Sequence, residues 1–210
     1  MKISAIVQCT ADEFASYKNF KTFYTVVPVL IKSKIFSNIT LCIGSSDKKI
    51  DKKILNFCKY YKIDVYQGEL YNPLKRIIKS AQNYKPDYII RFLLRQFFLD
   101  IKQLKYNLKI VLKNNLDTIF NPPDFNYTFV GDIFKFKSLK VVLNSINKIK
   151  NEKKKFSYYK SPAVFFEDNF KKFKTKITRI VIKKYTSKKI SIIHKKLNKL
   201  FTSENHVKTV

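Results

Sequence analysis

Hydrophobic and polar residues follow two patterns along this chain: short apolar runs, and longer segments in which apolar residues recur with a helical period. The runs predict a buried strand at Lys2–Cys9 and further strands at Ile39–Ile43, Asp64–Gln67 and Tyr88–Leu94. The amphipathic segments between them predict helices over Thr22–Lys34, over 50–61 after a cap at Asp47, and from Pro73 onward. Strands and helices that alternate in this way predict a three-layer α/β/α, Rossmann-like fold with a mostly parallel sheet.

The start of the helix at Pro73 is the most clearly marked boundary. Asn72 suits the N-cap position, and Pro73 suits the first helical position, where its missing N–H costs nothing. Apolar residues then recur at helical spacing until Pro86, at Leu74, Ile77, Ile78, Ala81 and Tyr84. This stretch therefore predicts a β-α-β unit that ends in the strand Tyr88–Leu94.

The second half of the chain has weaker patterns. They predict a helix at Ile101–Leu108, strands at Leu116–Phe120, Phe129–Phe136 and Ile177–Ile182, a helix capped by Ser138, and a last amphipathic helix at Thr186–Phe201. We interpret the lysine run Lys148–Lys155 as a solvated helix end or loop, with a nucleic-acid patch as the alternative. We expect one domain over residues 1–201 and a frayed tail over residues 202–210.

Composition excludes several classes of protein. With 45% hydrophobic and 15% aromatic residues the chain is not intrinsically disordered, and its longest continuous apolar run, Val26–Ile31, is too short to span a bilayer. The first residues resemble a strand and not a signal peptide. Three cysteines in apolar runs, without metal-ligand spacing, predict buried thiols in a reducing cytoplasm. The two histidines, His194 and His206, leave little for histidine-based metal or triad chemistry.

The net charge of +28 is concentrated toward the C-terminus, where residues 133–210 carry 22 Lys or Arg and four acids. Such a charge favours polyanions, either nucleic acid or an anionic membrane surface, or a phosphorylated substrate. Only four of the 43 cationic residues are arginines, although phosphate and base recognition usually favours the arginine fork. The charge therefore indicates anionic partners without choosing among them.

Glycine-rich phosphate-binding motifs are absent from the sequence. It contains no P-loop and no G-x-G-x-x-G, and its glycines are Gly44, Gly68 and Gly131. Any grip on phosphate must therefore come from lysine or arginine side chains and single loop amides.

The order of the elements, and above all the run VYQGELYNPLKRIIKSAQNYKPDYIIRF, resembles the cytidylyltransferases of surface-polysaccharide synthesis. The similarity is to the spore-coat-polysaccharide type, which is related to acylneuraminate cytidylyltransferases and CMP-Kdo synthetases. Gly68 matches the end of a V-x-x-G strand, Pro73–Arg76 and Ser80-Ala81 match the following helix, and Arg91 through Asp100 match an I-V-R-x-x-G-D-x-P-x-x-D segment. The resemblance implies a nucleotide-diphospho-sugar transferase fold.

The resemblance also implies an activity and a set of site residues. The family joins CTP to a sugar or sugar acid, releases pyrophosphate, uses Mg²⁺ and often forms homodimers. Carried over by position, the predicted catalytic residues are Arg91, Arg95 and Asp100, the nucleotide-binding residues are Gln8, Lys18 and Arg76, and the metal ligand is Asp132. Arg91 and Arg95 have a plainer interpretation as solvent or salt-bridge residues near a strand end.

Two departures from the family pattern affect the predicted chemistry. Asp12 and Glu13 lie in the segment that replaces the basic nucleotide loop, where they would repel a triphosphate. Arg95 takes the position of a metal-binding aspartate, and a cation about 4 Å from a divalent ion costs roughly 8 kcal/mol at an effective dielectric of 20. Three hypotheses stay open: an active cytidylyltransferase, a degenerate member that binds a nucleotide, a sugar or a protein without turnover, and a basic protein of nucleic acid or membrane surfaces.

Overall fold

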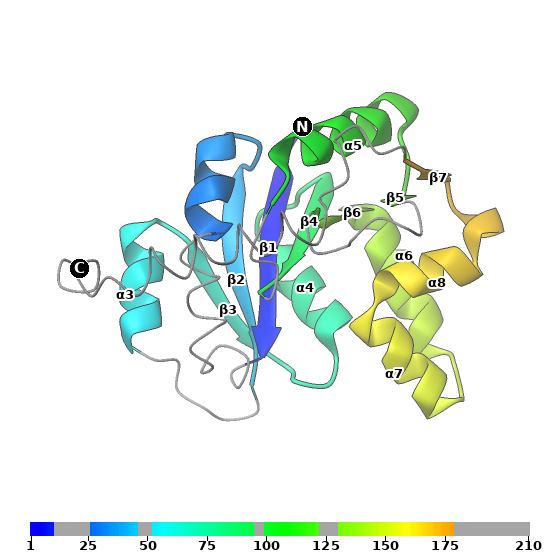
Figure 1. Cartoon of the computed structure of the whole chain (residues 1–210). Coiled ribbons are helices and arrows are strands. Elements are labelled where there is room, and N and C mark those ends of the chain that lie inside the picture. Colours follow the sequence, from blue (N-terminus) through cyan, green and yellow to red (C-terminus); the bar gives the residue numbers. More distant parts are fainter. Residues whose placement is uncertain (11–25, 46–51, 95–98, 122–129, 179–210) are drawn as a thin grey trace, which may run out of the picture.

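The computed structural model describes residues 1–10, 26–45, 52–94, 99–121 and 130–178, and these residues form one seven-stranded mixed sheet in the order β3-β2-β1-β4-β6-β5-β7 (Figure 1). The strands are β1 (Ile3–Thr10), β2 (Asn38–Gly44), β3 (Asp64–Gly68), β4 (Tyr88–Leu93), β5 (Thr118–Phe120), β6 (Asp132–Lys135) and β7 (Thr175–Ile177). β1 to β4 pair in parallel, β6 is antiparallel to β4 and β5, and β7 is parallel to β5.

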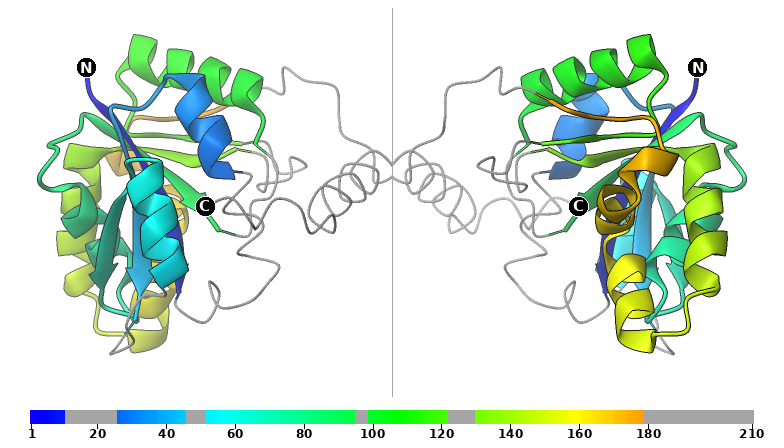
Figure 2. Two further views of the ribbon diagram at one scale, coloured as in Figure 1. Left: turned by 90° about the vertical axis from the view of Figure 1, so that its left-hand side faces the viewer. Right: turned by 90° about the vertical axis from the view of Figure 1, so that its right-hand side faces the viewer.

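Helices cover both faces of the sheet (Figure 2). They are the helical residues 26–33, α3 (Lys52–Tyr60), α4 (Pro73–Ala81), α5 (Ile101–Asn114), α6 (Phe136–Asn147), α7 (Glu152–Lys160), α8 (Pro162–Asp168) and the 3₁₀ turn η2 (Phe170–Lys172). Residues 26–33, α3 and α5 pack in one hydrophobic core, and α4, α6, α7 and α8 pack in a second on the opposite face. This is the three-layer α/β/α arrangement around a mostly parallel sheet that the alternation of strands and helices predicts.

The parallel strands bring several segments to one edge of the sheet. β1 lies between β2 and β4, with Gln8 in register with Cys42 on one side and Leu93 on the other. The chain leaves β1 toward β2 and later returns to its other side as β4, so a topological switch point lies at the C-terminal ends of β1 and β4. Open α/β sheets bind ligands at such points.

The predicted start of α4 is confirmed. The Asn72 side-chain oxygen Oδ1 accepts a hydrogen bond from the Lys75 amide at 3.0 Å, and Pro73 occupies the first turn. This cap satisfies one of the backbone donors that every helix leaves unpaired at its start. The helix begins at a position fixed by local side-chain chemistry, which is why the sequence predicts it well.

The predicted cap at Ser138 is wrong. β6 is shorter than expected, and α6 begins at Phe136 with Lys135 at the cap position and no side-chain cap. The Ser138 hydroxyl instead donates to the Asp117 carboxylate, which lies just before β5. The local pattern predicts Ser138 as a helix cap, but its hydroxyl bonds to the carboxylate of Asp117, which is distant in sequence.

The lysine run Lys148–Lys155 lies in the exposed loop after α6 and in the first turn of α7, in agreement with the predicted solvated helix end or loop. Asn151 caps α7, because its side chain accepts a hydrogen bond from the Lys154 amide at 3.0 Å. One further boundary differs from the prediction, since β7 begins at Thr175, ahead of the predicted strand Ile177–Ile182. Residues 179–182, Asp47, the predicted helix Thr186–Phe201 and the tail lie outside the described residues.

The burial of the cysteines agrees with the apolar runs in which they lie. Cys9, Cys42 and Cys58 are free and buried. None of the helices in the described part of the chain is long and apolar enough to cross a membrane.

Gly131, just before β6, packs too closely against β4 to accept a side chain. A Cβ at this position would lie 2.6 Å from the Phe92 ring, 2.7 Å from Ile90 Cγ2 and 2.9 Å from the Arg91 carbonyl oxygen. Because a backbone oxygen and two core side chains crowd it, Gly131→Ala is expected to lower the free energy of unfolding by about 2 kcal/mol through overpacking. Urea unfolding measures this loss, and an unchanged midpoint would contradict the tight packing of β6 on β4.

Candidate functional site

The candidate site is the strand-end edge, which we define as the C-terminal ends of β1, β2, β3 and β4 together with the start of β6. It contains Gln8 at the end of β1, the buried Arg76 from α4, and the Arg91–Asp132 ion pair between β4 and β6. These residues come from four separated parts of the sequence. Parallel pairing of β1 to β4 and antiparallel pairing of β6 bring them to the same edge.

Arg76 is a cation inside the protein, with only 2% of its surface exposed. Its Nη1 donates to the Glu69 carbonyl oxygen at 2.6 Å, and its Nη2 is 3.4 Å from the carbonyl oxygen of Cys9. The guanidinium therefore ties the loop after β3 to the end of β1. Its Nε has no hydrogen-bond partner among the described residues.

Two glycines make the room that Arg76 occupies. A Cβ on Gly44 would lie 2.2 Å from Arg76 Nη1 and 2.7 Å from its Cζ. A Cβ on Gly68 would lie 3.2 Å from Arg76 Cγ and 2.7 Å from the Tyr66 ring. Because glycine has no side chain, the ends of β2 and β3 can approach Arg76 closely. The requirement here is space and not an unusual backbone angle.

No negative charge neutralises Arg76 within the described residues. It forms no salt bridge there, and its hydrogen bonds go to backbone carbonyls. Burial raises the pKa of the neighbouring Cys42 thiol to about 11, although the positive charge of Arg76 opposes this rise. Cys42 is therefore a neutral thiol at pH 7 and does not neutralise Arg76. The positive charge of Arg76 therefore contributes to the electrostatic potential at the strand-end edge.

Gln8 places an unpaired amide at the switch point. Its side chain is 8% exposed, and its oxygen Oε1 has no hydrogen-bond partner among the residues described. Unpaired buried polar atoms are uncommon because each costs free energy, so such an atom is a candidate for contact with a ligand. Gln8 lies where the resemblance puts a nucleotide-binding residue.

Arg91 and Asp132 are brought together by the pairing of β4 with β6. Arg91 Nε donates to Asp132 Oδ2 at 2.9 Å, and Arg91 Nη1 donates to the Lys160 carbonyl oxygen at 2.9 Å. Arg91 is 5% exposed, whereas the Asp132 side chain is 26% exposed. Through these contacts Arg91 joins the sheet to the end of α7. Arg91 is thus a salt-bridge residue, as in its plainer interpretation. The Asp132 carboxylate, which is predicted to bind metal, is bonded to Arg91.

Asp100 is placed at the N-cap of α5. Its Oδ1 accepts the Gln103 amide at 2.8 Å, and its side chain is buried. No group of three or more Asp, Glu, His or Cys residues that could hold a metal ion occurs within the described ranges. Lys18 and Arg95, the remaining predicted site residues, lie outside those ranges.

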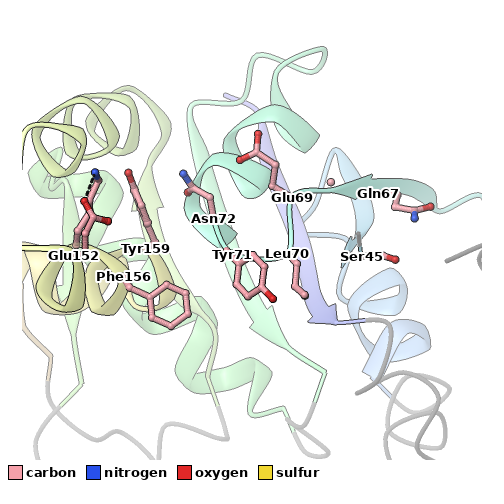
Figure 3. A pocket seen from close by; sticks show the side chains of 11 residues that line it. Ser45, Gln67, Glu69, Leu70, Tyr71, Asn72, Glu152, Phe156 and Tyr159 are labelled. Atoms are coloured by element: carbon pink, nitrogen blue, oxygen red, sulfur yellow. Dashed lines mark hydrogen bonds and ion pairs between the residues drawn. The ribbon is translucent and has the colours of Figure 1, made fainter. Parts of the chain in front are cut away.

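A groove of about 820 Å³ adjoins the edge on the β3 side (Figure 3). The loop after β3 contributes Tyr71 and Asn72 to one wall, and α7 contributes Phe156 and Tyr159 to the other. None of these four residues is predicted from the sequence as part of a binding site. The aromatic and amide residues between Gly68 and Pro73 are the only local signal, and α7 lies about 80 residues further along the chain.

Three solved structures resemble the chain in fold. A cytidylyltransferase from Leptospira borgpetersenii matches with a TM-score of 0.72 at 19% identity, over 86% of this chain and 77% of that one. A CMP:2-keto-3-deoxy-manno-octonic acid synthetase complexed with CTP matches with a TM-score of 0.63 at 6% identity, over 95% and 98%. The 4-diphosphocytidyl-2C-methyl-D-erythritol synthase from Anaerococcus prevotii matches with a TM-score of 0.57 at 14% identity, over 94% and 96%.

At these identities the likeness shows a shared fold and no more. No family model matches the chain. No curated protein sequence matches it either.

Proposed function

We propose that the chain is a cytidylyltransferase-like protein that binds CTP at the strand-end edge and transfers CMP to a sugar or sugar acid of a surface glycoconjugate. The observation that carries this proposal is the buried charge of Arg76 below the ends of β1, β2 and β3, which pairs with no carboxylate among the described residues. A buried cation without a counter-charge is stabilised by an anion nearby, and a triphosphate is a strongly charged candidate. Fold neighbours that are cytidylyltransferases, one of them in complex with CTP, support the choice of nucleotide.

In the proposed reaction, a hydroxyl oxygen of the acceptor attacks the α-phosphorus of CTP. A new P–O bond forms, the bond from the α-phosphorus to the bridging oxygen breaks, and pyrophosphate leaves. Arg76 would stabilise the negative charge of the phosphates without contacting the acceptor. The unpaired Gln8 oxygen would accept a hydrogen bond from a donor on the nucleotide.

The described carboxylates do not fit a Mg²⁺ site as they stand. Asp132 is bonded to Arg91, and Asp100 caps α5. Mg²⁺ usually needs one or two free carboxylates in addition to substrate phosphates. We therefore assign no step to the metal, although Mg²⁺ is the cofactor expected from the resemblance and belongs in the assay.

Pyrophosphate release tests the proposal. The protein is expected to release pyrophosphate from CTP and Mg²⁺ only when a suitable sugar or sugar acid is present, and excess EDTA is expected to stop it. An enzyme-coupled pyrophosphate assay over a panel of neutral sugars, aldonic acids and 2-keto sugar acids measures this release. A folded protein that binds CTP and stays silent over the panel would contradict catalysis.

The Arg91–Asp132 pair favours a second candidate function, binding without turnover. If Asp132 stays bonded to Arg91 in solution, CTP would raise the melting temperature while no pyrophosphate is released. The homodimer that the resemblance implies stays a prediction, and light scattering tests it by measuring the molar mass in solution.

A further inference from the structure

The groove beside β3 has a chemistry different from that of the rest of this basic protein. It lies between the loop of residues 69–72 and α7, and Ser45 and Gln67 form its far end (Figure 3). The positive charge of Arg76 lies behind the carbonyl oxygens of Glu69 and Leu70, which accept its hydrogen bonds. The groove therefore borders the strand-end edge and shares with it the end of β3, at Gln67 and Gly68.

Aromatic rings form the mouth of the groove. Tyr71 and Phe156 project from opposite walls toward the same space, and Tyr159 lies on the α7 wall near Phe156 (Figure 3). Tyr71 is 71% exposed and Phe156 is 39% exposed, and no described aromatic ring stacks on Tyr71. Exposed rings that share a groove are suited to a flat ligand with apolar faces.

Charges in the groove cancel one another, in a protein with a net charge of +28. Glu69 is paired with Lys75 at 2.5 Å, and Glu152 is paired with Lys155 at 3.0 Å. Beside these two pairs, Lys160 Nζ lies 4.9 Å from the centre of the Phe156 ring. The lining therefore carries little net charge, which favours a ligand without net charge.

Polar groups between the rings can bind hydroxyls. The Tyr71 hydroxyl and the Asn72 amide NH₂ have no hydrogen-bond partner among the residues that the structure describes, since the Asn72 cap uses only Oδ1. Carboxylate oxygens of Glu69 and Glu152 add acceptors beside them. The lining therefore offers both donors and acceptors, which suits a ring that carries several hydroxyl groups.

We propose that this groove is a binding site for an uncharged pyranose unit of a glycan, placed beside the nucleotide-binding edge. Apolar faces of the sugar ring would lie against Tyr71 and Phe156, and its hydroxyls would bond to Asn72 and the paired carboxylates. A volume of about 820 Å³ has room for more than one sugar unit. The proposal does not depend on CTP binding or on catalysis.

Saturation-transfer NMR tests this site on the full chain, with methyl pyranosides of glucose, galactose and mannose as neutral probes. At least one methyl pyranoside is expected to receive saturation that depends on Tyr71, and sodium glucuronate is expected to receive less. Tyr71→Ala is expected to weaken binding about fivefold, the effect of losing roughly 1 kcal/mol of ring contact. Tyr60→Ala removes an equally exposed tyrosine, at 67%, from α3 outside the groove and is expected to have no effect.

Three results would overturn the proposal: no saturation of any methyl pyranoside, saturation of glucuronate that exceeds that of all three pyranosides and is lost in Tyr71→Ala, or equal binding by wild type and Tyr71→Ala. Phe156→Ala provides a second variant from the opposite wall if Tyr71→Ala unfolds.

Discussion

Replacing Asp132 by alanine is expected to lower the free energy of unfolding by about 3 kcal/mol. The substitution leaves Arg91 with 5% exposure and only the Lys160 carbonyl as a hydrogen-bond acceptor. Breaking a buried ion pair costs about 3–5 kcal/mol because the remaining charge is uncompensated, and the partial exposure of Asp132 places this case at the low end. Urea unfolding followed by circular dichroism measures the change.

Two controls assign this loss to the ion pair. Glu167→Ala removes one negative charge from an exposed side chain of α8 and is expected to change stability by less than about 0.5 kcal/mol. Arg91→Met combined with Asp132→Ala is expected to cost less than the two single substitutions together. If Asp132→Ala unfolds at the same urea concentration as wild type, the carboxylate does not support Arg91 and is available for another role.

Replacing Arg76 by methionine is expected to weaken CTP binding by roughly 30-fold. A buried cation about 8 Å from a phosphate charge contributes roughly 2 kcal/mol at an effective dielectric of 20. The same substitution removes hydrogen bonds to the carbonyls of Cys9, Glu69 and Leu70, so we also expect stability to fall by about 2 kcal/mol. Calorimetric titration with CTP at a temperature where the variant is folded separates the two effects.

Lys79→Met is the matched control for Arg76→Met. Lys79 lies on the same helix and carries the same charge, but its side chain is exposed to solvent. It is expected to leave CTP affinity within about twofold of wild type, because solvent screens exposed charges. Equal losses in both variants would mean that CTP responds to net charge and not to the buried cation of Arg76.

Elements governed by local patterns were predictable from the sequence. The strands β1 to β4 are short apolar runs, and the start of α4 has an asparagine cap followed by proline. Because neighbouring residues determine these features, the fold class follows from their order. The error at Ser138 arises because its hydroxyl bonds to Asp117, 21 residues away, which no local pattern shows.

The site was less predictable, because its contacts join distant segments. The resemblance indicates Arg76, Arg91 and Asp132, yet the bond between Arg91 and Asp132 spans 41 residues and depends on the antiparallel pairing of β6. The burial of Arg76, on α4, depends on Gly44 at the end of β2. Nothing in the sequence around Gly44 indicates this contact. The residues of the edge can therefore be predicted from the sequence, but their ion pairing and burial cannot.

The groove shows the same limit more strongly. Its walls come from residues 69–72 and from α7, and each segment alone is an ordinary loop or a lysine-rich helix. Only packing of α7 against α4 brings the aromatic residues to the same space. A site of this kind follows from tertiary structure and not from a motif.

The most direct test of the central claim, that the strand-end edge binds CTP, is the map of amide chemical-shift changes in ¹⁵N-labelled protein titrated with CTP and Mg²⁺. The chain contains three glycines, and Gly44 and Gly68 flank the edge beside Arg76. The largest changes are expected at Gly44, Gly68 and Gln8, and they are expected to disappear in Arg76→Met but not in Lys79→Met. Changes confined to the lysine-rich surface of α6 and α7, or no changes at saturating CTP, would contradict the claim.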